Sequence, residues 1–155
     1  MTRPALAFAF CLLAAPALAE EPAALTGPAA VGATPFEGDG MIKAFHGQAG
    51  VGRIVDAFVA RNTSDPRIAD IFAAQDIPTF KARLKEHFCY VLGGGCQYTG
   101  KDMTTAHKDM GIETANFNAV VENLQWAMDK EGVAFSAQNR FLAKLAPLKR
   151  KIVTR

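Results

Sequence analysis

The stretch IPTFKARLKEHFCYVLGGG, residues 77–95, decides the fold class of this chain. Pro78 suits the first turn of a helix, and the three glycines that close the stretch would end that helix. Apolar and ring-bearing side chains recur every three to four positions, at Phe80, Leu84, His87, Phe88 and Val91. Spacing of this kind places one face of a helix against a core and leaves the charged residues to solvent.

The same spacing continues on both sides of this stretch. It predicts further helices over residues 49–62, 64–72, 113–132 and 136–153, the last kinked or shortened by Pro147. The alternation of apolar and polar residues that marks strands is scarce. We therefore predict an all-α domain, a bundle of four substantial helices with short connections.

The first forty residues do not share this pattern. Residues 1–19 combine Arg3, an apolar run and the ending Ala17-Leu18-Ala19, which is typical of a secretory signal peptide, and a retained anchor is the alternative. Residues 20–40 are rich in Pro, Ala and Gly, and are predicted to be a disordered spacer. One domain, residues 41–155, remains. We expect an exported, periplasmic protein with no stable membrane insertion after cleavage.

Cleavage would leave two cysteines, Cys89 and Cys96, on either side of the glycines. An exported chain meets an oxidising compartment, so a disulfide between them is expected. Two separate buried thiols are the alternative.

Charge argues against one class of partner. The formal net charge is only +2, and no basic stripe with interleaved aromatic residues is present. We expect no nucleic-acid partner.

A second stretch, GGGCQYTGKDMTTAHKDMGI at residues 93–112, holds one histidine on a short helical segment behind the glycines. Met103 and His107 are four residues apart and would share a face. A lone histidine on an apolar face is more often a hydrogen-bonded core residue than a metal ligand. The residues alone therefore leave the role of His107 open.

The pieces HGQAGVGRIVDAF, DPRIADIF, IPTFKARLKEHF and GGGCQYTGKDMTTAHKDMGI, taken in this order, resemble the truncated haemoglobins. The likeness is greatest to the first group of these two-over-two globins and extends over nearly all of residues 41–153. It implies a two-over-two helical sandwich around non-covalent haem b, since no Cys-x-x-Cys-His is present. By the same resemblance His107 is the proximal iron ligand, and Tyr98 and Met103 shape the site on that side.

The resemblance also marks a departure on the other side of the haem. Val59, which follows Phe58, stands where many relatives have a tyrosine that donates a hydrogen bond to the gas. Phe80 and Leu84 stand where glutamine or threonine is common, whereas Phe72 matches a phenylalanine that packs on the haem. This wall therefore lacks donors for O₂, and CO and NO need such donors less.

Two further residues are implicated on the same helix. His87 stands where the family usually has phenylalanine. It either serves the iron, as a distal ligand or as a hydrogen-bond donor to the gas, or bonds a propionate or a backbone carbonyl. Arg83 is expected at the mouth of the site, where it pairs with a haem propionate or stays a solvated charge.

The first expectation for function is a haem protein that binds O₂, NO or CO. The alternatives are a haem enzyme (a nitric oxide dioxygenase or a peroxidase-like protein) and a six-coordinate electron-transfer globin with a redox partner. A zinc site made by His87, Cys89, Cys96 and His107 ranks lower, because residues two apart on a helix point about 200° away from each other. A bundle without cofactor is the last alternative.

Overall fold

The computed structural model describes residues 27–155, in which every regular element is helical and no strand occurs. This confirms the predicted all-α class. The predicted signal peptide lies outside the described residues. No helix among the residues described is both long and apolar enough to cross a membrane. The helices are α1 (Pro28–Val31), α2 (Gly40–Ala44), α3 (Gly47–Ser64), α4 (Ala69–Phe72), α5 (Ile77–Val91), α6 (Met103–Ala106), α7 (Thr114–Lys130), α8 (Phe135–Leu145) and α9 (Lys149–Ile152).

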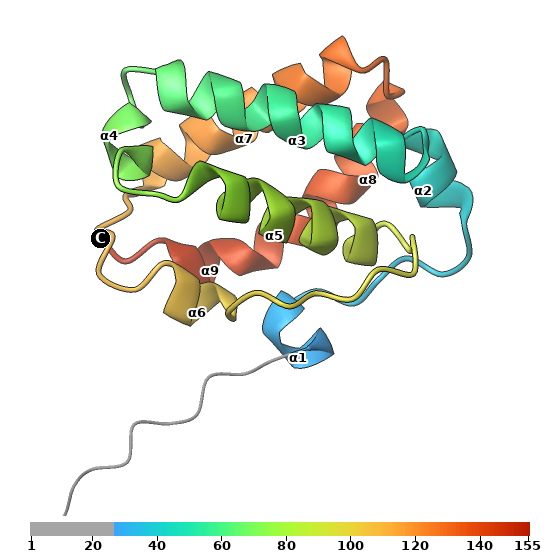
Figure 1. Ribbon diagram of the computed structural model, residues 1–155, viewed down its shortest axis with the longest axis horizontal. Helices are drawn as coiled ribbons and strands as arrows, with labels where there is room; N and C mark the ends of the chain where they lie inside the picture. The colour runs from blue at the N-terminus through green and yellow to red at the C-terminus, as the bar shows by residue number, and fades with distance from the viewer. Residues whose placement is uncertain (1–26) are drawn as a thin grey trace, which may run out of the picture.

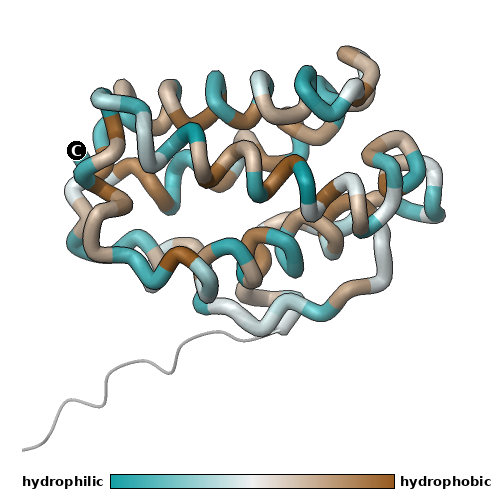
Figure 2. The backbone as a smooth tube through the Cα atoms, turned by 45° about the horizontal axis from the view of Figure 1, so that its top comes forward, coloured by the Kyte–Doolittle hydropathy of each residue, from teal (hydrophilic) through white to brown (hydrophobic). Residues whose placement is uncertain are grey.

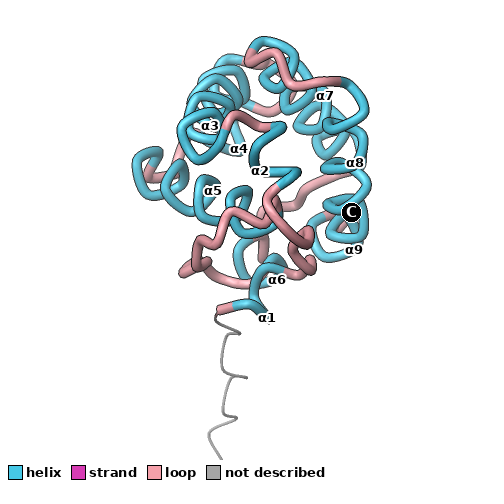
Figure 3. Tube along the Cα trace, turned by 90° about the vertical axis from the view of Figure 1, so that its right-hand side faces the viewer, coloured by secondary structure: helices cyan, strands magenta, loops and turns pink. Residues whose placement is uncertain are grey.

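The long helices form two layers (Figure 1). Seen end-on, α3 and α5 lie on one side and α7 and α8 on the other, with α1 and α6 at one end of the sandwich (Figure 3). Helix α3 packs against both α5 and α7, and so joins the two layers. This is the two-over-two arrangement that the resemblance implied.

Aromatic rings fill the space between the layers. Phe141 of α8 stands edge-on to Phe45 and to Phe88, with ring centres 5.2 and 5.1 Å apart. Phe58 lies 6.3 Å from Phe88 and extends this contact toward α3. Hydrophobic and hydrophilic residues alternate along the long helices, as expected where each helix buries one side (Figure 2).

Helix α5 begins and ends as its sequence predicts. At its start Thr79 Oγ1 donates to Asp76 Oδ2 at 2.6 Å, and Pro78 occupies the first turn. At its end Gly93 adopts a φ of +79°. A side chain there would also meet the carbonyl oxygens of Phe36 and Gly38, at 2.6 and 2.7 Å from an added Cβ. Glycine is therefore required both for the turn and for this close approach.

The C-terminal helix is interrupted, as Pro147 led us to expect. Helix α8 ends at Leu145, a short 3-10 turn covers Ala146–Leu148, and α9 follows. Helix α8 starts at Phe135, one residue before the predicted start, with Ala134 as its N-cap.

The predicted disulfide is present between Cys89 and Cys96, with Cα atoms 5.7 Å apart. It joins the last turn of α5 to the loop that leads to α6. Both sulfur atoms are used, so they cannot serve as thiolates in the four-ligand zinc site considered above.

The prediction of a disordered spacer is corrected for residues 27–40. Ala30 and Val31 are fully buried, and the Phe36 N–H donates to the Val91 carbonyl at 2.9 Å. Hydrophobic periodicity could not reveal this segment, because α1 has only four residues and the residues after it are not helical up to α2.

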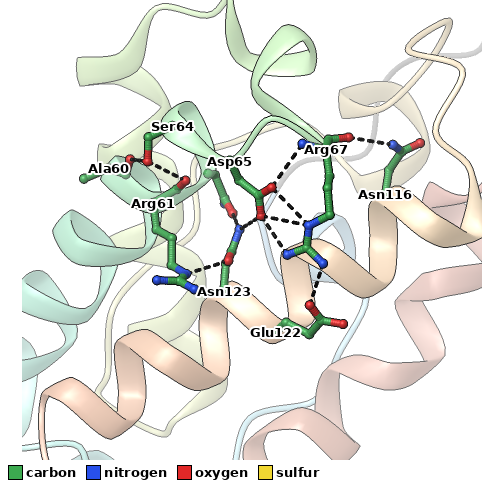
Figure 4. A network of polar contacts seen from close by, with 9 residues as sticks. Ala60, Arg61, Ser64, Asp65, Arg67, Asn116, Glu122 and Asn123 are labelled. Atoms are coloured by element: carbon green, nitrogen blue, oxygen red, sulfur yellow. Dashed lines mark hydrogen bonds and ion pairs between the residues drawn. The ribbon is translucent and has the colours of Figure 1, made fainter.

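A polar network joins the end of α3 to α7 (Figure 4). Buried Asn123 donates to Asn62 Oδ1 at 2.9 Å and to Asp65 Oδ2 at 3.0 Å, and its own oxygen accepts from Arg61 Nε at 2.7 Å. Arg67 continues the network by bonding Asp65 and Glu122. Among the described residues, the Asn62 amide nitrogen is the only buried side-chain polar atom without a partner.

Candidate functional site

His107 directly follows α6, a single turn capped by Asp102. Its Nδ1 lies 2.7 Å from the Met103 carbonyl oxygen. Because a carbonyl can only accept, Nδ1 carries the proton, and Nε2 keeps its lone pair with no partner among the described residues. Burial lowers the pKa of His107, which favours the neutral ring. The result is an oriented neutral imidazole with one free nitrogen, the form that binds metals.

Tyr98 makes a hydrogen bond within the loop that precedes α6. The phenol donates to the Lys101 carbonyl at 2.7 Å. Burial raises the pKa of Tyr98, so the hydroxyl stays protonated and keeps this bond. The ring packs beside Gly100, where an added Cβ would overlap it. Tyr98 thus shapes the loop that leads to α6. Its place beside a cofactor stays a prediction.

The same loop is tied to α5 by an acid that the sequence did not single out. Glu86 Oε2 accepts from the Thr99 backbone N–H at 2.9 Å and from its hydroxyl at 2.8 Å. Burial works to raise the pKa of Glu86, but the bonds from Thr99 and Arg83 outweigh it and lower the pKa. Arg83 forms an ion pair with Glu86 at 2.7 Å and also contacts the Thr99 hydroxyl. Its charge is engaged within the chain.

The residues predicted on the opposite wall are apolar and differ in burial. Phe58 and Val59, both on α3, are buried in the core. Phe72, Phe80 and Leu84 are only partly buried, and the rings of Phe72 and Phe80 lie 5.6 Å apart. This part of the chain therefore leaves large apolar side chains incompletely covered by protein.

His87 is almost fully buried, with 5% of its surface exposed. Its Nε2 lies 3.1 Å from the Val31 carbonyl oxygen, and its ring stands edge-on to Tyr98 at 5.4 Å. Burial lowers the pKa of His87, the bond to Val31 opposes this, and the nearby His107 lowers the pKa further. Of the roles considered for His87, the structure shows a bond to a backbone carbonyl.

The predicted residues thus fall into contacting groups. His107 bonds Met103, His87 faces Tyr98, and Phe72 packs on Phe80. Sequence reasoning missed Glu86 and Thr99, whose side chains look like ordinary surface residues. It also missed Val31, which acts through its main chain and so leaves no signal in the sequence.

Known proteins match this geometry and this sequence. Residues 42–154 match the bacterial-like globin family. A group 1 truncated hemoglobin of Chlamydomonas moewusii is 31% identical over 72% of this chain, and the match spans 64% of that protein. One from Mycolicibacterium paratuberculosis is 30% identical over 65% of this chain and 74% of its own length.

A solved structure carries the same fold. The truncated hemoglobin of Tetrahymena pyriformis, in its Fe(III) form, superposes with a TM-score of 0.71 at 23% identity, covering 74% of this chain and 98% of that one. With the family match over most of the domain, these likenesses identify the chain as a member of the bacterial-like globin family, similar to the group 1 truncated hemoglobins.

Proposed function

We propose that this chain is an exported haem protein that binds a diatomic gas, with haem b held non-covalently through His107 Nε2. The observation that carries the proposal is the fixed neutral imidazole of His107. The membership of the chain in the bacterial-like globin family supports the same cofactor. When bound, haem would supply an iron that His107 would hold and that would bind O₂, NO or CO.

The residues fit such a group. A haem needs one imidazole lone pair, an apolar surface for its ring and little else. His107 offers the lone pair, and the Met103 carbonyl fixes the orientation of its ring. Phe72, Phe80 and Leu84 offer apolar surface that the protein itself does not fully cover.

Gas preference follows from the missing donors. Val59, Phe80 and Leu84 carry no hydroxyl or amide, and the N–H of His87 is already given to Val31. A bound O₂ gathers negative charge and gains from a donor, whereas CO and NO gain less. We infer that the protein favours NO or CO over stable O₂ binding.

Replacing His107 tests the proposal. The His107→Gly variant should lose most of its haem affinity, because no other imidazole is oriented in the same way. Added free imidazole should restore a haem spectrum by filling the space. The matched control, His46→Gln, changes an exposed histidine and should keep the native spectrum. Haem uptake by His107→Gly equal to native, with the same axial ligation, would contradict the proposal.

Export is a separate part of the proposal. The leader sequence and the disulfide at Cys89–Cys96 both suit an oxidising compartment. Mass spectrometry of protein from the periplasm should find a chain that begins at Glu20. A full-length chain retained in the cytoplasm would contradict export while leaving haem binding untouched.

A further inference from the structure

The segment Gly27–Phe36, here called the N-terminal strap, crosses the end of the sandwich beside α6 (Figures 1 and 3). Its middle is packed tightly. An added Cβ at Gly32 would lie 2.8 Å from Leu148 Cδ2, 3.6 Å from Lys151 Nζ and 3.8 Å from Met103 Cγ. The strap therefore touches both α6, which precedes His107, and the C-terminal region.

The far end of the strap is held in two ways. The Phe36 N–H donates to the Val91 carbonyl at 2.9 Å, at the end of α5. The Phe36 ring lies under two cations, Arg140 at 5.3 Å and Lys144 at 4.9 Å. Such contacts are individually weak, so the strap is held by several modest interactions rather than by one strong one.

Next to Gly32, the strap contacts the imidazole of His87. The Val31 carbonyl oxygen lies 3.1 Å from His87 Nε2, and both residues are buried. A carbonyl accepts only, so Nε2 must carry the proton and donate. A nitrogen that carries a proton has no lone pair for a metal. The strap thus removes Nε2 of His87 from possible coordination.

His87, which is buried, and His107, which is partly buried, form a matched pair. Each has one ring nitrogen bonded to a backbone carbonyl, His87 to Val31 and His107 to Met103. In each, the other nitrogen has no hydrogen-bond partner among the residues that the structure describes. The rings are close enough to influence each other electrostatically. The pair differs in one respect: the carbonyl that fixes His107 belongs to its own helix, whereas that of His87 belongs to the strap.

We propose that the N-terminal strap is a latch on His87, in which the Val31 carbonyl is a positioning group that keeps Nε2 of this imidazole from the iron and leaves the iron to the gas. This rests on the proposed function, in which His107 holds a haem. Release of the strap frees Nε2, and His87 then competes with the gas. If His87 occupied the iron in nine of ten molecules, the apparent gas affinity would fall about tenfold.

Two glycines provide a matched test, Gly32 within the strap and Gly38 just beyond it. Gly32→Val places a side chain against Leu148 at a φ of +72°, which should displace the strap. Gly38→Val meets the same backbone cost at a φ of +66°, with nothing within 4 Å of the added Cβ. The control therefore carries the strain without the steric clash. A chain lacking residues 20–33 removes the latch outright.

The visible spectrum of the haem-loaded protein is the main measurement. Native protein and Gly38→Val should give a high-spin ferric spectrum, whereas Gly32→Val and the truncated chain should turn low-spin and bind CO more slowly. Adding His87→Leu to each latch variant should restore the high-spin spectrum and fast CO binding. A native protein that is already low-spin through His87 would overturn the proposal. A high-spin truncated chain, or a low-spin signal that survives His87→Leu, would overturn it as well.

A second measurement does not need haem. In the haem-free protein, ¹⁵N NMR should show His87 as the Nε2–H tautomer, with a proton that exchanges slowly. Gly32→Val should speed this exchange at least about tenfold, and Gly38→Val should not, because only the former uncovers the bond. If the protein bound no haem but this contrast held, the proposed function would fail while the strap contact stood. If native exchange were already fast, the latch would fail whatever the haem does.

Discussion

Two regions of the molecule are held by different kinds of polar contact: the contact between α3 and α7, and the region around α6. Where α3 meets α7, side chains bond side chains: Asn123 alone links Arg61, Asn62 and Asp65. Near α6 the polar contacts of the histidines are to backbone carbonyls, and each ring keeps a free nitrogen. A network of side-chain bonds contributes to stability, whereas a ring nitrogen with a free lone pair leaves capacity for a ligand. The difference separates a structural region from a functional one within the same two layers.

The first prediction breaks the structural region. Asn123→Ala should lower the free energy of unfolding by about 3 kcal/mol, because it removes the bond to buried Asn62, the bond from the Arg61 guanidinium and one of the bonds to Asp65. Urea unfolding measures this. The matched control is Gln125→Ala on the same helix, whose side chain makes no hydrogen bond among the described residues.

Two readouts sharpen the comparison. Haem uptake by Asn123→Ala, measured well below its unfolding midpoint, should equal that of native protein. A loss of stability no greater than in Gln125→Ala would show that the network contributes little. A change in the haem spectrum without unfolding would show that the two regions are not separate.

The sequence could predict the structural frame because side-chain patterns encode it. The face formed by Phe80, Leu84 and Phe88 identified α5, and Pro147 identified the break between α8 and α9. Spacing and compartment together predicted the bond between Cys89 and Cys96. In each case the information lies in residue type and position along one segment.

The candidate site could be predicted only in part. His107 was found because resemblance placed it, and its bond to Met103 follows from helical spacing. The contact between His87 and Val31 joins residues that are 56 apart in the sequence, and a residue of any type at position 31 would carry the same backbone carbonyl. No sequence pattern specifies a main-chain acceptor at that distance, and the strap has no hydrophobic period.

A second prediction restores a donor on the apolar wall. Leu84→Gln should slow O₂ dissociation about five- to thirtyfold, which corresponds to about 1–2 kcal/mol for a hydrogen bond in a dry site. Leu84→Met, which is similar in size and has no strong donor, is the control and should change the rate little. Stopped-flow displacement of O₂ by CO measures both. Equal rates in the two variants would mean that position 84 does not face the gas.

The smallest expected effect is a dependence on pH that belongs to the functional region alone. Burial lowers the pKa of both His87 and His107, so below the usual histidine pKa of about 6.5 the unfolded chain takes up protons more readily than the folded one. The free energy of unfolding of the haem-free protein should therefore fall as the pH drops from 7 toward 5, and stay level above 7 on account of these groups. His87→Phe should reduce this slope, since the more deeply buried of the two imidazoles is gone. Urea titrations at half-unit intervals of pH measure the slopes. An unchanged slope in His87→Phe would mean that this imidazole binds protons equally well in the folded and the unfolded chain, and so that burial does not lower its pKa.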